Sequence, residues 1–375
     1  MPNNAKNEYQ YDFIHVFTMG SKIFNLSTVQ LIKKVADNFR NLFVFRYEEE
    51  YLAAKEIAED IVLNKKVGDI EEIKVIEKLG RYIVIHGLIY ENNNLVKLMV
   101  SQAERVIWCV WGSDIYHVYK YNFMLYKLVR KIYRMIMGNT KDDKKAAKVI
   151  SSFAAIAVGF KGDYFEIRKR YGRNVPIYSA LYPMGYYLED LEKWREAPKQ
   201  HDYLNVLIGH SAYRFLHHKK YLKKLRKYGK RVKIYLPLSY GNMSYVTEVK
   251  TLATKLYDRN QLVIIEDMLS AETYFKLLCQ IDVAIFDFEH QAAYGNMLLL
   301  MYLNKKIYLS TSGVMYRGFQ QMGLEVDDAK KIGHVDLFKL KDPPISKNNV
   351  VYATRQLDLA NIENDWKKMF NELMI

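Results

Sequence analysis

Short apolar runs alternate with polar turns and helix-favouring stretches along most of this chain. The clearest example lies between Ile281 and Ser310. An apolar run ends at Phe286, a polar turn follows, unbranched residues occupy 297–303, and a second apolar run begins at Ile307. Apolar runs of this length predict buried strands, and unbranched residues favour a helix. The stretch therefore predicts a strand–loop–helix–strand unit of a parallel sheet, whose loop lies where open α/β sheets bind ligands.

The same unit recurs on both sides of a charged stretch near residue 190. In the first half we expect strands over 13–17, 42–45, 82–85, 105–110 and 154–158. In the second half we expect them over 203–208, 231–236, 262–265, 281–286 and 307–310. Ser27 is a candidate cap for the first helix, and residues 48–59 predict a solvated acidic helix. The fold class is α/β, with two doubly wound, Rossmann-like halves.

The chain divides into four segments on this pattern. Residues 1–185 form an amino-terminal domain, 186–203 a charged linker, and 204–345 a carboxyl-terminal domain. Residues 346–375 are expected to be one or two helices without a strand, with packing back on the amino-terminal domain as one arrangement.

The composition indicates the class of protein and the cellular compartment. Half of the 375 residues are hydrophobic and 26% are charged, which is typical of a globular protein. The two cysteines lie in or beside apolar stretches and give no disulfide framework. No apolar run reaches the roughly 18 residues that a spanning helix needs, and the amino terminus has no export signal. We therefore expect a cytosolic protein.

The net charge of +14 indicates either an anionic partner or a solvating role, and two basic stretches carry much of it. Lys127, Arg130, Lys131 and Arg134 share one predicted helical face, with apolar residues on another. Such a helix suits an anionic membrane surface, although a core helix with a solvated basic face has the same pattern. Residues 219–233 hold nine Lys or Arg and no acid, and they could meet lipid phosphates, a nucleotide or solvent.

The candidate binding and catalytic residues lie directly after the predicted strands. Gly209, His210 and Ser211 follow one strand, and together with Arg214 they could cradle a phosphate. The alternative is ordinary turn chemistry, because neither a Walker loop nor a G-x-G-x-x-G motif occurs.

Asp114 follows the glycine turn after another strand. It could act as a base or accept a sugar hydroxyl, or it could cap a helix. His86 also stands at a strand end. The H-E-x-x-H pattern and cysteine pairs are absent, so we expect no metal site.

Five ordered motifs carry a family resemblance. They are H-G-L-I-Y at His86, W-G-S-D-I-Y at Trp111, V-L-I-G-H-S-A-Y-R at Val206, L-P-L-S-Y-G at Leu236 and D-V-A-I-F-D-F-E-H-Q-A-A-Y-G-N at Asp282. Together they resemble the TDP-N-acetylfucosamine:lipid II N-acetylfucosaminyltransferases of enterobacterial common antigen assembly, glycosyltransferase family 56. The resemblance runs from the first strand to about Leu309.

This resemblance implies a GT-B architecture, in which two Rossmann-like domains face a central cleft. It implies transfer of an N-acetylfucosamine from a dTDP donor to an undecaprenyl-diphosphate-linked saccharide, retaining and metal-independent, on the cytoplasmic membrane face. Gly209, His210, Ser211, Arg214 and Tyr240 would hold the donor nucleotide and its phosphates, and Gln291, Gly295 and Asn296 the donor sugar and diphosphate. His86 and Asp114 would face the acceptor. Gln291 and Leu299 stand where many retaining GT-B enzymes carry glutamates.

Three other functions stay open at this point. A related transferase could use another nucleotide sugar for capsule or teichoic-acid-type polymers. A nucleic-acid-binding protein would explain the charge, but RRM, KH and helix-turn-helix signatures are absent, so no nucleic acid is expected. A sugar-nucleotide sensor would bind a donor without turnover.

Overall fold

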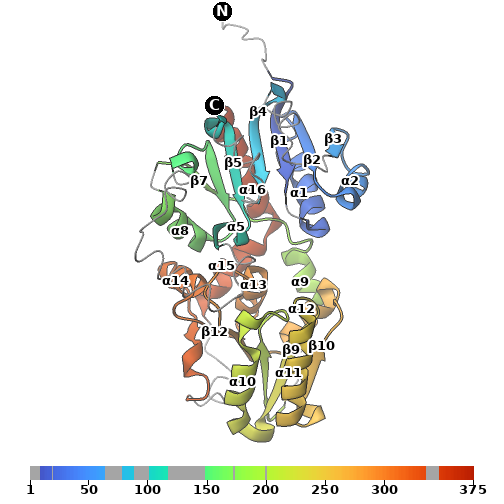
Figure 1. The fold of residues 1–375 in the computed structure, drawn as a ribbon, viewed down its shortest axis with the longest axis vertical. Coiled ribbons are helices and arrows are strands. Elements are labelled where there is room, and N and C mark those ends of the chain that lie inside the picture. Colours follow the sequence, from blue (N-terminus) through green and yellow to red (C-terminus); the bar gives the residue numbers. More distant parts are fainter. Residues whose placement is uncertain are drawn as a thin grey trace, which may run out of the picture. The chain divides into compact units, whose positions relative to one another are not determined.

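The computed structural model describes residues 9–18, 20–63, 78–87, 101–116, 148–171, 174–198, 201–334 and 346–375. The chain forms two compact units (Figure 1). The first comprises Met1–Gly185 together with Leu359–Ile375, and the second is Tyr186–Asp358. Each contains a parallel sheet flanked by helices, which confirms the prediction of two Rossmann-like domains.

The first unit is built on a seven-stranded parallel sheet in the order β3-β2-β1-β4-β5-β6-β7. Its strands are β1 (Tyr11–Phe17), β2 (Asn41–Phe45), β3 (Ile61–Leu63), β4 (Gly80–His86), β5 (Val106–Val110), β6 (Ala155–Val158) and β7 (Ile177–Ser179). The flanking helices are α1 (Lys22–Val35), α2 (Glu48–Ala54), α5 (Ser113–Tyr116), α8 (Lys161–Tyr171) and α16 (Leu359–Met374), with the short η1 (Ala103–Arg105). The strand order reverses between β1 and β4, which marks the switch point.

The second unit has a six-stranded parallel sheet in the order β10-β9-β8-β11-β12-β13. Its strands are β8 (Leu204–Ile208), β9 (Val232–Pro237), β10 (Leu262–Ile265), β11 (Val283–Phe286), β12 (Lys306–Leu309) and β13 (Asp327–Asp328). The helices are α9 (Leu188–Trp194), α10 (His218–Leu225), α11 (Met243–Leu256), α12 (Ala271–Cys279), α13 (Tyr294–Tyr302), α14 (Val314–Gln321) and α15 (Lys347–Leu357). Single-turn segments are η3 (Arg214–Leu216), η4 (Arg226–Arg231), η5 (Arg259–Gln261) and η6 (Ala329–Lys331). The switch point here lies between β8 and β11.

Burial explains why the central strands are almost wholly apolar. Helices cover both faces of a doubly wound sheet, so a central strand has no solvated side. Every residue of β5, β8 and β11 is buried. Each unit has a core of its own, centred on these strands.

The unit boundaries differ from the predicted segments. Residues 186–203 were expected to be a linker, but they contain α9, which packs on α12 in the second unit. The predicted carboxyl-terminal helices divide between the units. α15 packs on α13, whereas α16 belongs to the first unit, where Trp366 Nε1 donates to the Leu181 carbonyl at 2.9 Å. Figure 1 shows α16 in red beside the blue and green strands of the first sheet.

The first helix also begins earlier than predicted. α1 starts at Lys22, directly after Ser21, so Ser27 lies inside the helix and the prediction of Ser27 as its cap was wrong. Among the described residues, no helix is both long and apolar enough to cross a bilayer.

Candidate functional site

The switch point of the second unit brings two loops to one sheet edge. One follows β8 and begins at Gly209; the other follows β11 and begins at Asp287. The Gly209 amide donates to the Ile285 carbonyl at 2.9 Å, which joins the end of β8 to β11. In doubly wound sheets this is where ligands bind.

Gly209 occupies a position that only glycine fits. Its φ is +69°, and a Cβ placed there would lie 2.7 Å from Nε2 of His218. Left-handed backbone at this φ is rare for residues with a side chain. The chain therefore turns tightly over His218, the first residue of α10, which is fully buried.

Several buried polar atoms around this turn lack a well-formed hydrogen bond within the described part of the chain. Among the described residues, none forms a hydrogen bond with His210 Nδ1 or Ser211 Oγ, and the His218 ring lies near the Ile208 backbone without a well-formed hydrogen bond. Ser211 and His218 are 0% exposed. Each unmade buried hydrogen bond costs about 1–3 kcal/mol, so such a cluster points to a bound polar group. Burial lowers the pKa of His218 to about 4, so its imidazole is neutral near pH 7 and can both donate and accept.

Asp287 ties the two loops together. Lys220 Nζ donates to Asp287 Oδ2 at 2.6 Å, and His217 Nδ1 donates to the Asp287 carbonyl at 2.8 Å. Burial alone would raise the pKa of Asp287, but hydrogen bonds from His217, Lys220 and Tyr221 outweigh it and hold that pKa well below its usual range. The hydrogen bond with Asp287 in turn raises the pKa of His217. The pair fixes the start of α10 against the end of β11.

The amino end of α13 completes this edge. Gly295 and Asn296 lie in its first turn and are partly exposed. Ala293 precedes the helix with a φ of 55° and makes no side-chain cap. Amides at an uncapped helix start, which lack intrahelical partners, are suited to an anion. Gln291 lies just before this turn and is partly exposed, whereas Leu299 is buried in the core at 2% exposure.

Arg214 lies at the rim and is already paired. Its Nη1 donates to Glu248 Oε2 at 3.0 Å, its Nη2 donates to Oε1, and Lys219 Nζ donates to Oε2 at 2.6 Å. These bonds from Arg214 and Lys219 lower the pKa of Glu248 to about 2. Tyr240 is 44% exposed, and its ring centroid lies 6.3 Å from that of His210. Tyr240 therefore lies beside the Gly209 turn, whereas Arg214 lies further along the same loop, against Glu248.

In the first unit, His86 lies inside the sheet rather than on its surface. His86 is 0% exposed, and burial lowers its pKa well below the ordinary range. Its Nε2 lies 3.1 Å from His15 Nδ1, and its Nδ1 lies 2.7 Å from the Tyr182 hydroxyl. His15 Nε2 in turn lies 3.1 Å from Asn41 Oδ1.

Asn41 fixes the direction in which the hydrogen bonds of this series are donated. Its amide nitrogen donates to the carbonyls of Ala36 and Phe39, so its oxygen must accept from His15 Nε2. A neutral His15 then accepts at Nδ1 from His86, and His86 accepts from the hydroxyl of Tyr182. Both ring nitrogens of His86 are thus used internally, and its assignment to the acceptor site stays a prediction.

Asp114 is also held inside the fold. Its Oδ2 accepts from the Trp108 indole at 2.8 Å, and its Oδ1 accepts from the Trp111 and Ile115 amides at 3.1 Å. The side chain is 4% exposed. Asp114 lies inside the first turn of α5, so it is not the N-cap residue of that helix, but its carboxylate fixes the 111–115 turn. A catalytic role for Asp114 stays a prediction.

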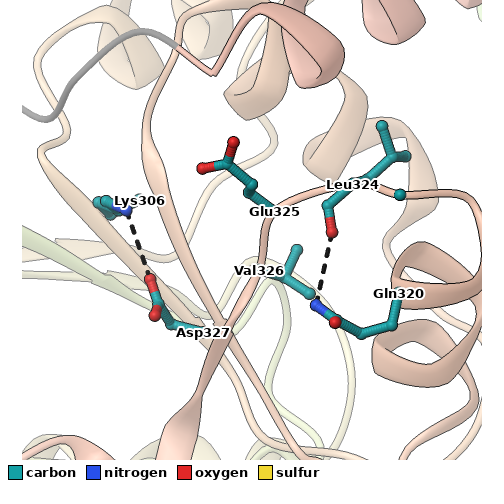
Figure 2. A pocket seen from close by; sticks show the side chains of 7 residues that line it. Lys306, Gln320, Leu324, Glu325, Val326 and Asp327 are labelled. Carbon is teal, nitrogen blue, oxygen red and sulfur yellow. Dashed lines mark hydrogen bonds and ion pairs between the residues drawn. The ribbon is translucent and has the colours of Figure 1, made fainter.

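Lys127, Arg130, Lys131 and Arg134 lie outside the described residues. A pocket of about 360 Å³ lies beside Lys306, at the amino end of β12 and so away from the switch point. Figure 2 shows two pairs among its lining residues: Lys306 with Asp327 at 3.6 Å, and Gln320 with the Leu324 carbonyl at 3.5 Å.

Sequence reasoning missed His218, Asp287 and Glu248. Asp287 had a usable signal, because it directly follows the apolar run of β11. His218 and Glu248 had none, because their positions depend on how α10 and α11 pack over the β8 loop.

Comparison with known proteins decides the family. A family model described as 4-alpha-L-fucosyltransferase, glycosyl transferase group 56, matches residues 73–357, about three quarters of the chain. The chain belongs to glycosyltransferase family 56. It is therefore a transferase enzyme, and the resemblance read from the five motifs is confirmed.

Solved structures share the fold of this family 56 protein. A glycosyltransferase from Rickettsia africae ESF-5 is 12% identical, with a TM-score of 0.63, over 98% of this chain and 99% of that one. Anabaena Alr3699/HepE, solved in complex with UDP, is 12% identical with a TM-score of 0.66, over 96% of this chain and 100% of its own. These likenesses support the GT-B architecture for the family 56 chain.

Proposed function

We propose that this family 56 enzyme moves an N-acetylfucosamine-type sugar from a dTDP-sugar to an undecaprenyl-diphosphate-linked saccharide. The reaction is retaining and needs no metal. The enzyme works as a peripheral protein on the cytoplasmic face of the membrane, in the synthesis of a bacterial surface polysaccharide. The donor binds the second unit.

The observation that carries the donor site is the cluster of unpaired buried atoms at the Gly209 turn. Ser211 Oγ and the His218 ring need polar partners, and the described residues give neither a well-formed hydrogen bond. The uncapped start of α13 lies after the neighbouring strand, on the same sheet edge. A nucleotide diphosphate offers the oxygens that both features require. The Anabaena relative was solved with UDP, which supports a nucleotide for this fold.

The chemistry follows from where charge builds up. The bond between the anomeric carbon and the β-phosphate oxygen breaks, and the diphosphate leaves with the electron pair. The acceptor hydroxyl oxygen bonds to the anomeric carbon and gives its proton to an oxygen of the departing diphosphate. Preorganised amides and cations stabilise the charge on the leaving diphosphate. In this proposal Gly295 and Asn296 supply amides, and Arg214 supplies the cation.

Calorimetry tests the donor site directly. We expect dTDP to bind more tightly than UDP or GDP, and Ser211→Ala to weaken dTDP binding by about tenfold, the scale of one good hydrogen bond. Ser152→Ala, an exposed serine of the first unit, is the matched control and should bind normally. Equal dTDP affinity in both variants would remove Ser211 from the site.

Turnover tests the rest of the proposal. A panel of nucleotide sugars with polyprenyl-diphosphate-linked acceptors should give product only with a dTDP-N-acetylfucosamine-type donor. The anomeric configuration of the product, read by NMR, should match that of the donor, and chelation by EDTA should leave the rate unchanged. Product from another donor would replace the proposed sugar, and binding without any turnover would favour a sensor.

A further inference from the structure

A basic surface runs along α10, η4 and η6 of the second unit. Its exposed cations come from two segments that are about a hundred residues apart in sequence. They are Lys223, Arg226, Lys227, Lys230, Lys330 and Lys331. We call these six residues the α10 basic surface. Lys224 Nζ donates to the Lys330 carbonyl at 3.1 Å and Lys227 Nζ donates to the Gly333 carbonyl, which holds the two segments together.

The amphipathic pattern of α10 places the lysines of that helix on its solvent-facing side. His218, Tyr221, Leu222 and Leu225 are buried against the sheet. Residues three or four apart share a helix face, so the lysines between them fall on the opposite, solvent-facing side. Lys223 therefore faces solvent, and the hydrogen bonds of Lys224 and Lys227 bring the 330–333 turn beside the end of α10 and the start of η4.

These cations differ from those near the donor site in having no carboxylate partner. Lys219 pairs with Glu248 at 2.6 Å and Lys220 pairs with Asp287 at 2.6 Å. Within the part of the chain that the structure describes, no carboxylate forms an ion pair with any member of the α10 basic surface. Unpaired like charges repel one another, and an external anion would offset that repulsion.

The residue types of the α10 basic surface indicate which class of anion it binds. Nucleic-acid surfaces that bind single strands pair cations with exposed rings on which bases stack. Here the rings of Tyr221 and Tyr228 are 0% and 6% exposed, so the surface offers neither for stacking. Five of its six cations are lysines, which act as flexible point charges and suit a field of lipid phosphates.

We propose that the α10 basic surface binds the anionic phospholipid headgroups of a bilayer. This rests on the proposed function, since a polyprenyl-linked acceptor brings the enzyme to a membrane. α10 begins at His218 beneath the Gly209 turn, and at about 1.5 Å per residue Lys223 lies only about 7 Å further along the helix axis. Lipid contact at this surface would therefore hold the donor site close to the bilayer.

Sedimentation with vesicles tests this surface. The full chain is mixed with vesicles of phosphatidylcholine alone or with 30% phosphatidylglycerol (roughly the anionic share that gives such membranes their surface potential). The test variant changes Lys223, Arg226, Lys230 and Lys330 to Gln. The control variant changes Lys255, Arg259, Lys347 and Lys367 to Gln, which removes the same charge from exposed positions elsewhere.

We expect the unchanged protein to bind the anionic vesicles and not the neutral ones. The test variant should lose about 100-fold or more in affinity, since each of its four basic residues contributes about fivefold near such a surface. The control variant should lose only a few-fold. Unchanged binding by the test variant, equal losses in the two variants, or tighter binding of the unchanged protein to RNA or DNA than to vesicles would each overturn the proposal.

The same samples separate this proposal from the donor assignment. dTDP affinity, measured by calorimetry without vesicles, should be the same in all three proteins. Lost vesicle binding with normal dTDP binding supports both proposals. Vesicle binding without dTDP binding in the unchanged protein would overturn the donor site and leave the α10 basic surface as a lipid-binding one.

Discussion

At the residue scale, Asp114 shows how a chemically attractive carboxylate can serve the fold. The sequence places it after a strand and a glycine turn, where a base or a cap fits equally well. The structure gives its oxygens an indole and two amides as donors. This leaves no need for a substrate to satisfy the carboxylate.

Asp114→Asn separates the two roles. An amide has one accepting atom, so it leaves a buried donor facing its own NH₂ group. We expect the free energy of unfolding to fall by about 1–3 kcal/mol, measured by urea denaturation. A catalytic base predicts normal stability and a rate at least about 100-fold lower. Normal stability with a collapsed rate would therefore restore Asp114 as a catalytic residue.

Arg214 raises a similar question, because its guanidinium already meets Glu248. If it also contacts the donor diphosphate, Arg214→Ala should weaken dTDP binding by about 1.5–3 kcal/mol, the scale of a charge-assisted hydrogen bond. Calorimetry gives the value. Lys250→Ala is the matched control, since Lys250 lies on the same helix as Glu248 and pairs with a different carboxylate, Glu266. An unchanged affinity in a folded Arg214 variant would leave the residue as a surface ion pair.

At the element scale, length decides which strands the sequence reveals. The central strands contain four to seven residues and are almost wholly apolar, so their runs stand out against the polar loops. β3, β7 and β13 have only two or three residues and lie at or near sheet edges, where no apolar run is required. The Gly209 turn was predictable because it follows a clear strand. Its partner His218 was not, because packing alone brings it beneath the turn.

The buried His15–His86 pair joins β1 to β4 and makes the stability of the first unit depend on pH. Burial lowers the pKa of His15 from 6.5 to about 4. The unfolded chain therefore binds a proton more readily, and stability present above pH 6.5 is lost as the pH falls toward 4. At pH 5 the loss is about 2 kcal/mol for this one group.

Denaturation at pH 7 and pH 5 tests this dependence. His15→Gln should be less stable at pH 7, but it should lose about 2 kcal/mol less than the unchanged protein on acidification. His334→Gln, at an exposed turn, should keep the full pH dependence. The same loss in the His15 variant would show that another group titrates.

The basic helix expected around residues 127–136 lies outside the described residues, so its contact with a membrane stays a prediction. Changing Lys127, Arg130, Lys131 and Arg134 to Gln should release the enzyme from anionic vesicles, at about 1 kcal/mol per residue. Activity on a short soluble acceptor should survive. Because the α10 basic surface is intact in this variant, the informative result is the affinity: an unchanged vesicle affinity at low salt would make this segment a core helix.

At the scale of the whole molecule, the chain leaves the first unit at Gly185 and returns to it at Leu359. The second unit is thus inserted between two parts of the first. α16 supplies Trp366, which is 0% exposed, and Phe370, whose ring lies 4.8 Å from that of Phe13 on β1. The sequence showed helices here but not their unit, because an amphipathic helix does not specify which apolar surface it covers.

Trp366→Ala tests how far the first unit depends on α16. Removing a buried tryptophan should cost the first unit about 3–5 kcal/mol. Calorimetric melting should show its transition at a lower temperature, while dTDP binding by the second unit is retained. Parallel loss of both properties would mean that the two units unfold as one.

The inserted arrangement also sets an order of events during synthesis. The strands of the first sheet leave the ribosome well before the helix that covers β1. The 173 residues from Tyr186 to Asp358 must be translated in between, which at about 5–20 residues per second takes roughly 10 to 30 seconds. Through that interval the apolar surface around Phe13 waits without its cover, and a chaperone or the membrane surface itself has time to reach it first.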